Sequence, residues 1–323
     1  MKTIGIDISQ DWFDAAFEAS GRHRKSRFAN TRKGFSEFHK WLKKNDIQKP
    51  HLFMEATGRY WEPLAMWCCS QGWPVTVLNP RHVRKFAESS GRYNKSDPLD
   101  SECLAEFGQT CRSEQARLWK PRSTAQAELR EIHMEIEGVK RMITAERNRS
   151  KSCLRSIFVA DVIRGNIEQL NAVRKELEKR ALMIIKGSPE LLPLYRALKM
   201  VKGFGDTSII VLLAKIDFDQ FKKGRQLVGF AGLAPRKWES GKSVHKKETI
   251  SRIGHADLRA ALYFPAITAM THDPEMVEYK RHLQSLGKEN KVIICAVMAR
   301  MLRKAFAVVR DTKRAAQAAP VAA

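Results

Sequence analysis

Four carboxylates stand where the ends of apolar strands and the start of a helix would gather them. Asp7 follows the first apolar stretch of the chain, Glu55 ends a second, and Asp97 and Asp100 open a helix. An acid directly after an apolar strand is costly unless it is solvated, hydrogen-bonded or metal-bound. Carboxylate oxygens are the ligands that Mg²⁺ prefers, and Mn²⁺ would substitute for it. The four acids therefore predict a metal site acting on a phosphodiester.

The acidic pair has a simpler interpretation as well. Pro98 suits the first helical position, which makes Asp97 an N-cap and places Asp100 three residues later on the same helix face. In that interpretation Asp97 only caps the helix, and Asp100 has a role like that of a capping box.

Basic residues surround these acids. The chain has 58 Lys and Arg against 35 Asp and Glu, a formal net charge of +23 over 323 residues. Such an excess favours a polyanionic partner, because neutralising phosphates releases condensed counterions. The alternative is a solvated surface tuned for solubility. Before the acidic pair, the candidate nucleic-acid contacts are Arg81, Arg84, Lys85, Arg92 and Lys95.

A second candidate site is a basic stretch that contains Ser240. A serine hydroxyl needs activation to attack phosphorus, and nearby cations would stabilise the charge that develops. Ser240 also fits a turn beside Gly241, and the stretch fits a hairpin loop that contacts phosphates. Ser243 lies close enough to compete for the nucleophile role. The candidate contacts here are Arg236, Lys237, Lys242, Lys246 and Lys247.

The elements that must position the acids form an α/β domain over residues 1–122. The first three predicted strands can form a meander, whereas the later ones need helical crossovers. The predicted strands are residues 4–8, 12–17, 23–28, 51–54 and 74–78, and the predicted helices are residues 34–42 and 61–70.

After Pro121 the pattern becomes helical. Residues 123–188 predict a linker of two long helices that form an antiparallel or intermolecular coiled coil, with a restart near Gly165. An ordinary helical layer packed on the first domain is the alternative.

Residues 189–323 predict a mostly helical C-terminal domain. Its glycine loop at residues 200–207 resembles half of a helix-hairpin-helix, which grips phosphate, although simple turn chemistry also explains it. A polar loop and helices over residues 257–271 and 291–309 follow, and the tail after Arg314 is expected to fray.

Two features bear on the compartment. The six cysteines show no C-x-x-C spacing, and there is no histidine cluster at zinc spacing, so buried free thiols are expected. No apolar run approaches the roughly 20 residues of a spanning helix, and no signal-like stretch precedes Asp7. The sequence predicts a cytoplasmic protein, nucleoid-associated when active, without a membrane partner.

Several of these motifs occur in an order that resembles a known family. The ordered set is Gly5-Ile6-Asp7, Glu55-Ala56-Thr57-Gly58, Asn79-Pro80, residues 95–100, residues 231–235, Glu239-Ser240-Gly241 and Ile253-Gly254-His255 with Leu258-Arg259. This set resembles the DEDD transposases of the insertion-sequence family of bridge-RNA-guided recombinases, over nearly the whole chain. The resemblance implies a RuvC-like, ribonuclease-H-like N-terminal domain, a coiled-coil linker and a C-terminal transposase domain.

The resemblance also implies roles. Asp7, Glu55, Asp97 and Asp100 would form the Mg²⁺-binding DEDD set, and Ser240 would form a covalent phosphoserine link to cleaved DNA. A structured guide RNA would pair with donor and target DNA. Protomers would assemble as a tetramer, a dimer of dimers with composite sites. Ser96 and Ser101 depart from the usual Thr and Ala but leave the acids in place.

Three other functions fit part of the pattern. A RuvC-like endonuclease that uses water would need the four acids but no serine. An ATPase of the same core fold would share the first loop, but a later glycine-rich adenosine loop is missing. A non-catalytic nucleic-acid-binding protein would use the acids structurally.

Overall fold

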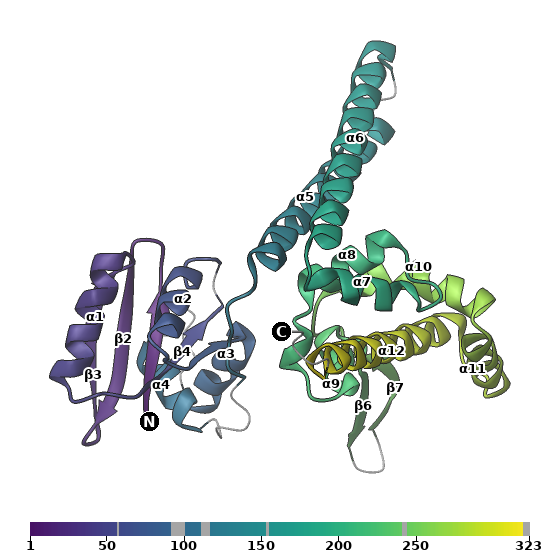
Figure 1. Ribbon diagram of the computed structural model, residues 1–323. Coiled ribbons are helices and arrows are strands. Elements are labelled where there is room, and N and C mark those ends of the chain that lie inside the picture. Colours follow the sequence, from purple (N-terminus) through teal and green to yellow (C-terminus); the bar gives the residue numbers. More distant parts are fainter. Residues whose placement is uncertain (57, 92–100, 111–116, 153–154, 241–243, 319–323) are drawn as a thin grey trace. The chain divides into compact units, whose positions relative to one another are not determined.

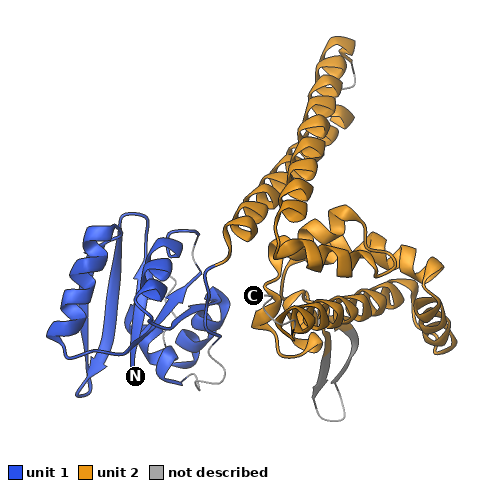
Figure 2. Ribbon diagram, viewed as in Figure 1, with its two compact units in different colours: residues 1–121 blue, residues 122–323 orange. Residues whose placement is uncertain are grey.

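The computed structural model describes the chain except residues 57, 92–100, 111–116, 153–154, 241–243 and 319–323 (Figure 1). For residues 237–240 and 244–248 it describes the backbone alone. The chain divides into two compact units, Met1–Pro121 and Arg122–Ala323 (Figure 2). The further division of the second unit near residue 188 stays a prediction.

A five-stranded mixed sheet forms the centre of the first unit, in the order β3-β2-β1-β4-β5. Strands β1, β2 and β3 pair antiparallel as the predicted meander, whereas β1 and β4, and β4 and β5, pair parallel. The strands occupy the predicted stretches: β1 Lys2–Ile8, β2 Trp12–Ala19, β3 Arg22–Ala29, β4 Pro50–Glu55 and β5 Val75–Leu78.

One face of this sheet carries the larger core. Alternation along β1 turns Ile4, Ile6 and Ile8 to this face, where all three are buried. Helices α1 (Arg32–Lys44) and α2 (Glu62–Ser70) belong to the same cluster. Aromatic side chains from β2, β3 and α1 meet there at ring distances of 5–6 Å, the range that stabilises edge-to-face and tilted pairs.

Helices α3 (Pro80–Ser89) and α4 (Ser101–Thr110) contribute to the core on the opposite face. Helix α4 approaches β1 very closely because two glycines lie at the contact. A Cβ atom on Gly5 would lie 1.9 Å from the carbonyl oxygen of Ser101, and one on Gly108 would lie 2.5 Å from Cγ2 of Thr3. The backbone of α4 therefore rests directly on the strand that carries Asp7.

The second unit begins with two long helices, α5 (Thr124–Ser152) and α6 (Ile157–Gly187), which pack along each other (Figure 1). The predicted break at Gly165 is wrong, because α6 continues through it. The helix begins instead at Ile157, after the N-cap Ser156, whose Oγ accepts a hydrogen bond from the Val159 amide at 3.3 Å. The coiled coil itself stays a prediction.

The rest of the second unit is mostly helical and shares one large core. The stretch around Ser240, predicted as a polar loop with a hairpin loop as one interpretation, is flanked by two strands that pair as a hairpin. The helix before α12 was missed. The predicted frayed tail begins too early, since α12 continues past Arg314. The elements are α7 Leu191–Lys199, α8 Asp206–Lys215, a 3₁₀ turn Phe218–Gln220, α9 Gly224–Phe230, β6 Pro235–Ser240, β7 Val244–Ile250, α10 Ala256–His272, α11 Pro274–Ser285 and α12 Asn290–Ala318.

The cysteines in the described residues are free thiols, of which Cys68 and Cys103 are buried. Burial raises the pKa of the Cys68 thiol far above its ordinary value, so it stays protonated.

Across the part of the chain that the structure describes, no helix combines the length and apolarity of a membrane span.

Candidate active site

Asp7 and Glu55 lie side by side at one end of the sheet. Strands β1 and β4 run parallel, and their register pairs Ile6 with Met54, so the next residues on each strand are neighbours. Both side chains point to the face of α4, since their neighbours Ile6 and Met54 belong to the core on the other face. The structure thus brings together two of the four predicted acids.

This pair of carboxylates is crowded. Glu55 is half-buried, and burial, then the charge of Asp7, raises the pKa of its carboxyl. Two acids in such an environment favour a divalent cation between them, because hard cations prefer carboxylate oxygens. Within the described ranges no three His, Cys, Asp or Glu side chains form a metal-binding group.

The other two predicted acids, Asp97 and Asp100, lie outside the described residues. Ser101 is the first residue of α4, and its carbonyl oxygen lies over Gly5, two residues before Asp7 on β1.

A third acid, which the sequence analysis missed, continues the row of Asp7 and Glu55. Asp14 on β2 pairs directly with Asp7 in the antiparallel register, and Arg27 on β3 pairs with Asp14. The side chain of Asp14 is 7% exposed, and both of its oxygens accept hydrogen bonds from Arg27 at 3.0 Å. An acid inside the apolar run of β2 was the available signal.

Ser240 is the last residue of β6, where the backbone pairs with Val244 of β7. Of the basic candidates nearby, Arg236 is exposed. Lys237, Lys246 and Lys247 lie in the hairpin strands, whose side chains the structure does not describe there, and Lys242 and Ser243 lie outside the described residues. The role of Ser240 stays a prediction.

The basic candidates before the acidic pair belong to α3. Arg81, Arg84 and Lys85 are exposed on this helix, and Arg84 forms an i,i+4 ion pair with Glu88 at 3.4 Å. Arg92 and Lys95 lie outside the described residues. An exposed cationic face suits phosphate contacts as well as it suits solvent.

The second unit contains a polar cluster around Asp257, the second residue of α10. The carboxylate of Asp257 lies 2.6 Å from the ammonium of Lys215 and 3.5 Å from the buried imidazole of His133. Burial raises the pKa of Asp257, but the neighbouring His133 imidazole and Lys215 ammonium outweigh it and hold the pKa well below its usual range. This cluster connects α5, α8 and α10, because side chains from all three helices meet at the ionised carboxylate of Asp257.

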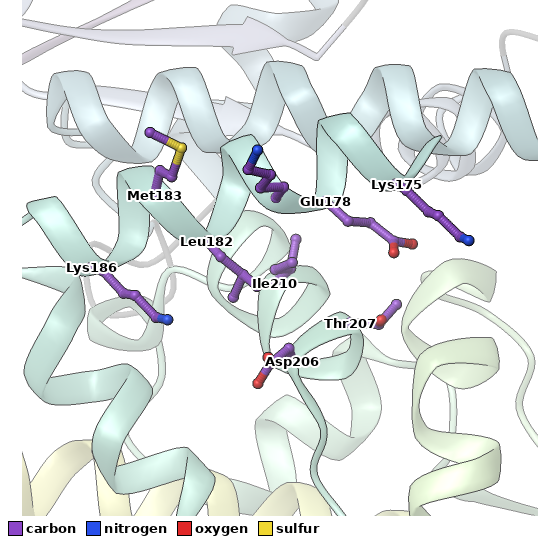
Figure 3. A pocket seen from close by; sticks show the side chains of 9 residues that line it. Lys175, Glu178, Leu182, Met183, Lys186, Asp206, Thr207 and Ile210 are labelled. Atoms are coloured by element: carbon purple, nitrogen blue, oxygen red, sulfur yellow. The ribbon is translucent and has the colours of Figure 1, made fainter. Parts of the chain in front are cut away.

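The glycine loop between α7 and α8 leads into a polar contact and lies beside a cavity. Asp206 at the start of α8 accepts a hydrogen bond from Tyr195 at 2.9 Å and pairs with Lys199. A cavity of about 470 Å³ lies beside it, between α6 and α8, lined by Lys175, Glu178, Lys179, Leu182, Met183, Lys186, Asp206, Thr207 and Ile210 (Figure 3). A carboxylate already stands at this helix start, so phosphate binding by the loop stays a prediction.

Comparisons with known proteins agree with the ordered motifs. A DEDD transposase model of the IS110 type matches residues 4–159, and a model described as a transposase of the IS116/IS110/IS902 family matches residues 195–281. The chain is 33% identical to the pilin gene-inverting protein of Moraxella bovis and 34% identical to that of Moraxella lacunata, each over 96% of both chains. It is 24% identical to the transposase for insertion sequence element IS1111A of Coxiella burnetii, over 93% of this chain and 90% of the relative.

Proposed function

Because this chain belongs to the IS110 family of transposases, we propose that it exchanges DNA strands by a Mg²⁺-dependent reaction through a phosphoserine intermediate at Ser240. Its class of activity, DNA transposition or recombination, follows from the family itself. The observation that carries the proposal is the adjacency of Asp7 and Glu55 at the ends of paired strands, beneath the start of α4.

The donor set fits Mg²⁺. Asp7 and Glu55 supply hard oxygen ligands, and the raised pKa of Glu55 reflects burial together with a negative charge that a cation would offset. In the proposal Asp97 and Asp100 complete the ligand set from the segment before α4. When bound, the ion supplies charge stabilisation at the oxygens of the scissile phosphate.

Ser240 is the proposed nucleophile. Its Oγ forms a bond to phosphorus, the bond from phosphorus to the leaving strand oxygen breaks, and the hydroxyl proton ends on that oxygen. The energy of the phosphodiester is conserved in the serine ester, so a new strand end can displace the serine without another energy source. The Ser240 that completes each acidic site would come from another protomer, in a tetramer built as a dimer of dimers.

A structured guide RNA is the proposed source of sequence specificity. The exposed residues Arg81, Arg84 and Lys85 on α3, together with Arg236, would contact nucleic-acid backbones. The remaining proposed contacts are Arg92, Lys95, Lys237, Lys242, Lys246 and Lys247. Since each neutralised duplex phosphate contributes about 0.9 to the slope of log K against log salt, binding should weaken steeply with salt.

The experiment combines the purified protein, Mg²⁺, RNA transcribed from the flanks of the element and labelled donor and target DNA. The expected product is a protein–DNA adduct that protease digestion removes. Ser240→Ala should abolish it, and Ser243→Ala, the matched control three residues away, should retain it. Free cleaved ends without an adduct, unchanged in Ser240→Ala, would instead indicate a RuvC-like hydrolase.

The metal ligands need a separate variant. Glu55→Ala should nearly abolish strand exchange while most RNA binding is retained. Intact exchange in this variant would contradict the role of the acids and favour a purely structural one.

A further inference from the structure

The row of charged side chains on the α4 face extends beyond the acids to Arg27. Across strands β4, β1, β2 and β3 the registers place Glu55, Asp7, Asp14 and Arg27 in sequence. Three neighbouring acids would repel one another, because like charges directly opposite each other destabilise a sheet. Arg27 neutralises Asp14, which leaves Asp7 and Glu55 as the anionic pair.

The guanidinium of Arg27 is held from two directions. Its Nε and Nη2 donate to the two oxygens of Asp14 at 3.0 Å, and its plane lies over the indole of Trp12, 3.8 Å from the ring centre. Trp12 and Asp14 are two residues apart on β2 and share a face of the sheet. Bidentate pairing and stacking together fix both the position and the orientation of the cation.

The ion pair with Asp14 does not occupy all the hydrogen-bond donors of Arg27. The side chain of Arg27 is 60% exposed, although its partner Asp14 is 7% exposed. In the part of the chain that the structure describes, no hydrogen bond involves Nη1 of Arg27. A pre-ordered guanidinium with one donor edge open to solvent matches the geometry of a phosphate oxygen.

The position of Arg27 relative to the acids indicates which phosphate of the DNA it would contact. Arg27 lies two strands from Asp7, roughly 10 Å across the sheet at the usual strand spacing. The same face and the same row place it where a phosphate next to the one at Asp7 and Glu55 would pass.

We propose that Arg27 binds the DNA phosphate that flanks the cleaved one, with Asp14 and Trp12 as the residues that position its guanidinium. The inference rests on the proposed function for the location of the cleaved phosphate. It adds a substrate-positioning cation on β3 to the acids on β1 and β4.

The test compares Arg27→Gln with Arg24→Gln in the full-length protein assembled with the flanking RNA. Arg24 lies on the same strand but pairs with Phe17, a core residue, so it points to the opposite face, where it donates to Asn45 at 2.8 Å. Both variants lose one charge. Labelled donor DNA is titrated at several salt concentrations, and the rate of strand exchange is measured against DNA concentration.

Arg27→Gln should raise the DNA concentration for half-maximal exchange about tenfold, as expected for loss of a charge-assisted hydrogen bond. It should lower the salt slope of DNA binding by about 0.9 and leave the maximal rate within about twofold. Arg24→Gln should behave as wild type. Arg27→Lys should keep the salt slope but not the affinity, because an ammonium cannot pair with Asp14 at two points.

Equal half-saturation and equal salt slopes in Arg27→Gln and Arg24→Gln would overturn the proposal. A loss of RNA affinity instead of DNA affinity would overturn the assignment to DNA. If Arg27→Gln unfolds because Asp14 loses its partner, the double variant Asp14→Asn/Arg27→Gln is tested in its place. This double variant removes both charges and leaves no unpaired buried carboxylate. Failure of the wild type to form the serine adduct would contradict the proposed function alone. The salt dependence of DNA binding can still be compared between the variants, because it does not depend on cleavage.

Discussion

Substitution of Gly5 by alanine should disable the active site without removing any polar group. The added Cβ would lie 1.9 Å from the carbonyl oxygen of Ser101 and 2.3 Å from the amide nitrogen of Ala105. Both atoms belong to the backbone, so no flexible side chain can move aside. Since ordinary carbon contacts begin near 3.5 Å, α4 must retreat from β1 by about 1.5 Å.

The size of the effect follows from that displacement. Overpacking of this kind costs about 1–3 kcal/mol, which lowers the Tm of a domain of about 120 residues by roughly 4–12 °C. The start of α4, which directly follows the proposed ligands Asp97 and Asp100 in the chain, moves away from Asp7. A misplacement of about 1 Å reduces catalysis roughly 100-fold, so strand exchange should fall by at least that factor at temperatures where the domain is folded.

The assay is thermal unfolding followed by strand exchange at about 15 °C below the measured Tm, beyond the expected shift. Gly165→Ala is the matched control, because Gly165 is inside helix α6 and the added Cβ would meet no atom within 4 Å beyond its chain neighbours and the adjacent backbone of its own helix. The control should gain about 0.5–1 kcal/mol of stability, as expected for alanine in a helix. A Gly5→Ala protein with the Tm and the activity of the wild type would refute the close packing of α4 on β1 and its proposed importance for strand exchange.

Two other substitutions test the charged clusters. Glu55→Gln should raise the Tm of the protein in EDTA, since it removes a half-buried charge next to Asp7, and should abolish the added stability that Mg²⁺ confers on the wild type; a Mg²⁺-dependent Tm that survives would contradict the metal site. Asp257→Asn should flatten the acid limb of the stability curve. The folded-state pKa of Asp257 is depressed, so its contribution is present above the unfolded pKa of about 3.9 and is lost as pH falls through the folded value, and chemical denaturation between pH 7 and pH 2 measures this. An acid limb identical to that of the wild type would show that His133 and Lys215 do not stabilise the carboxylate.

The sequence predicted the strands that carry the acids because β1 alternates isoleucines with other residues and β4 is a short continuous apolar run. In β1, isoleucines at positions 4, 6 and 8 alternate with Gly5 and Asp7, which assigns Asp7 to the face opposite the core. The register between the strands could not be predicted. Nothing in the sequence alone pairs Asp7 with Asp14 or Asp14 with Arg27, because register depends on turn geometry and on the packing of the whole sheet.

The errors in the second unit have local causes. Gly165 did not interrupt α6, because a single glycine costs a helix only about 1 kcal/mol, which packing along α5 offsets. Helix α11 was missed although Asp273 caps it at the Glu275 amide and Pro274 occupies its first position, a start signal that the sequence contains. The hairpin of β6 and β7 lacks apolar alternation, so its pairing could not be inferred from periodicity.

The charge arrangement of the first unit reconciles an acidic site with a polyanionic substrate. A protein of net charge +23 attracts DNA as a whole, yet in the proposed reaction the phosphate to be cleaved must approach Asp7 and Glu55 closely. Asp14 adds a third acid to that row, but its pairing with Arg27 converts the added charge into a fixed cation two strands away. In the proposed function and the further inference, the sheet presents an anionic pair for a metal ion and, on the same face, a cation for the neighbouring phosphate. A buried aspartate next to Asp7 is therefore compatible with DNA binding, because the ion pair with Arg27 neutralises the charge of Asp14 and orients the guanidinium.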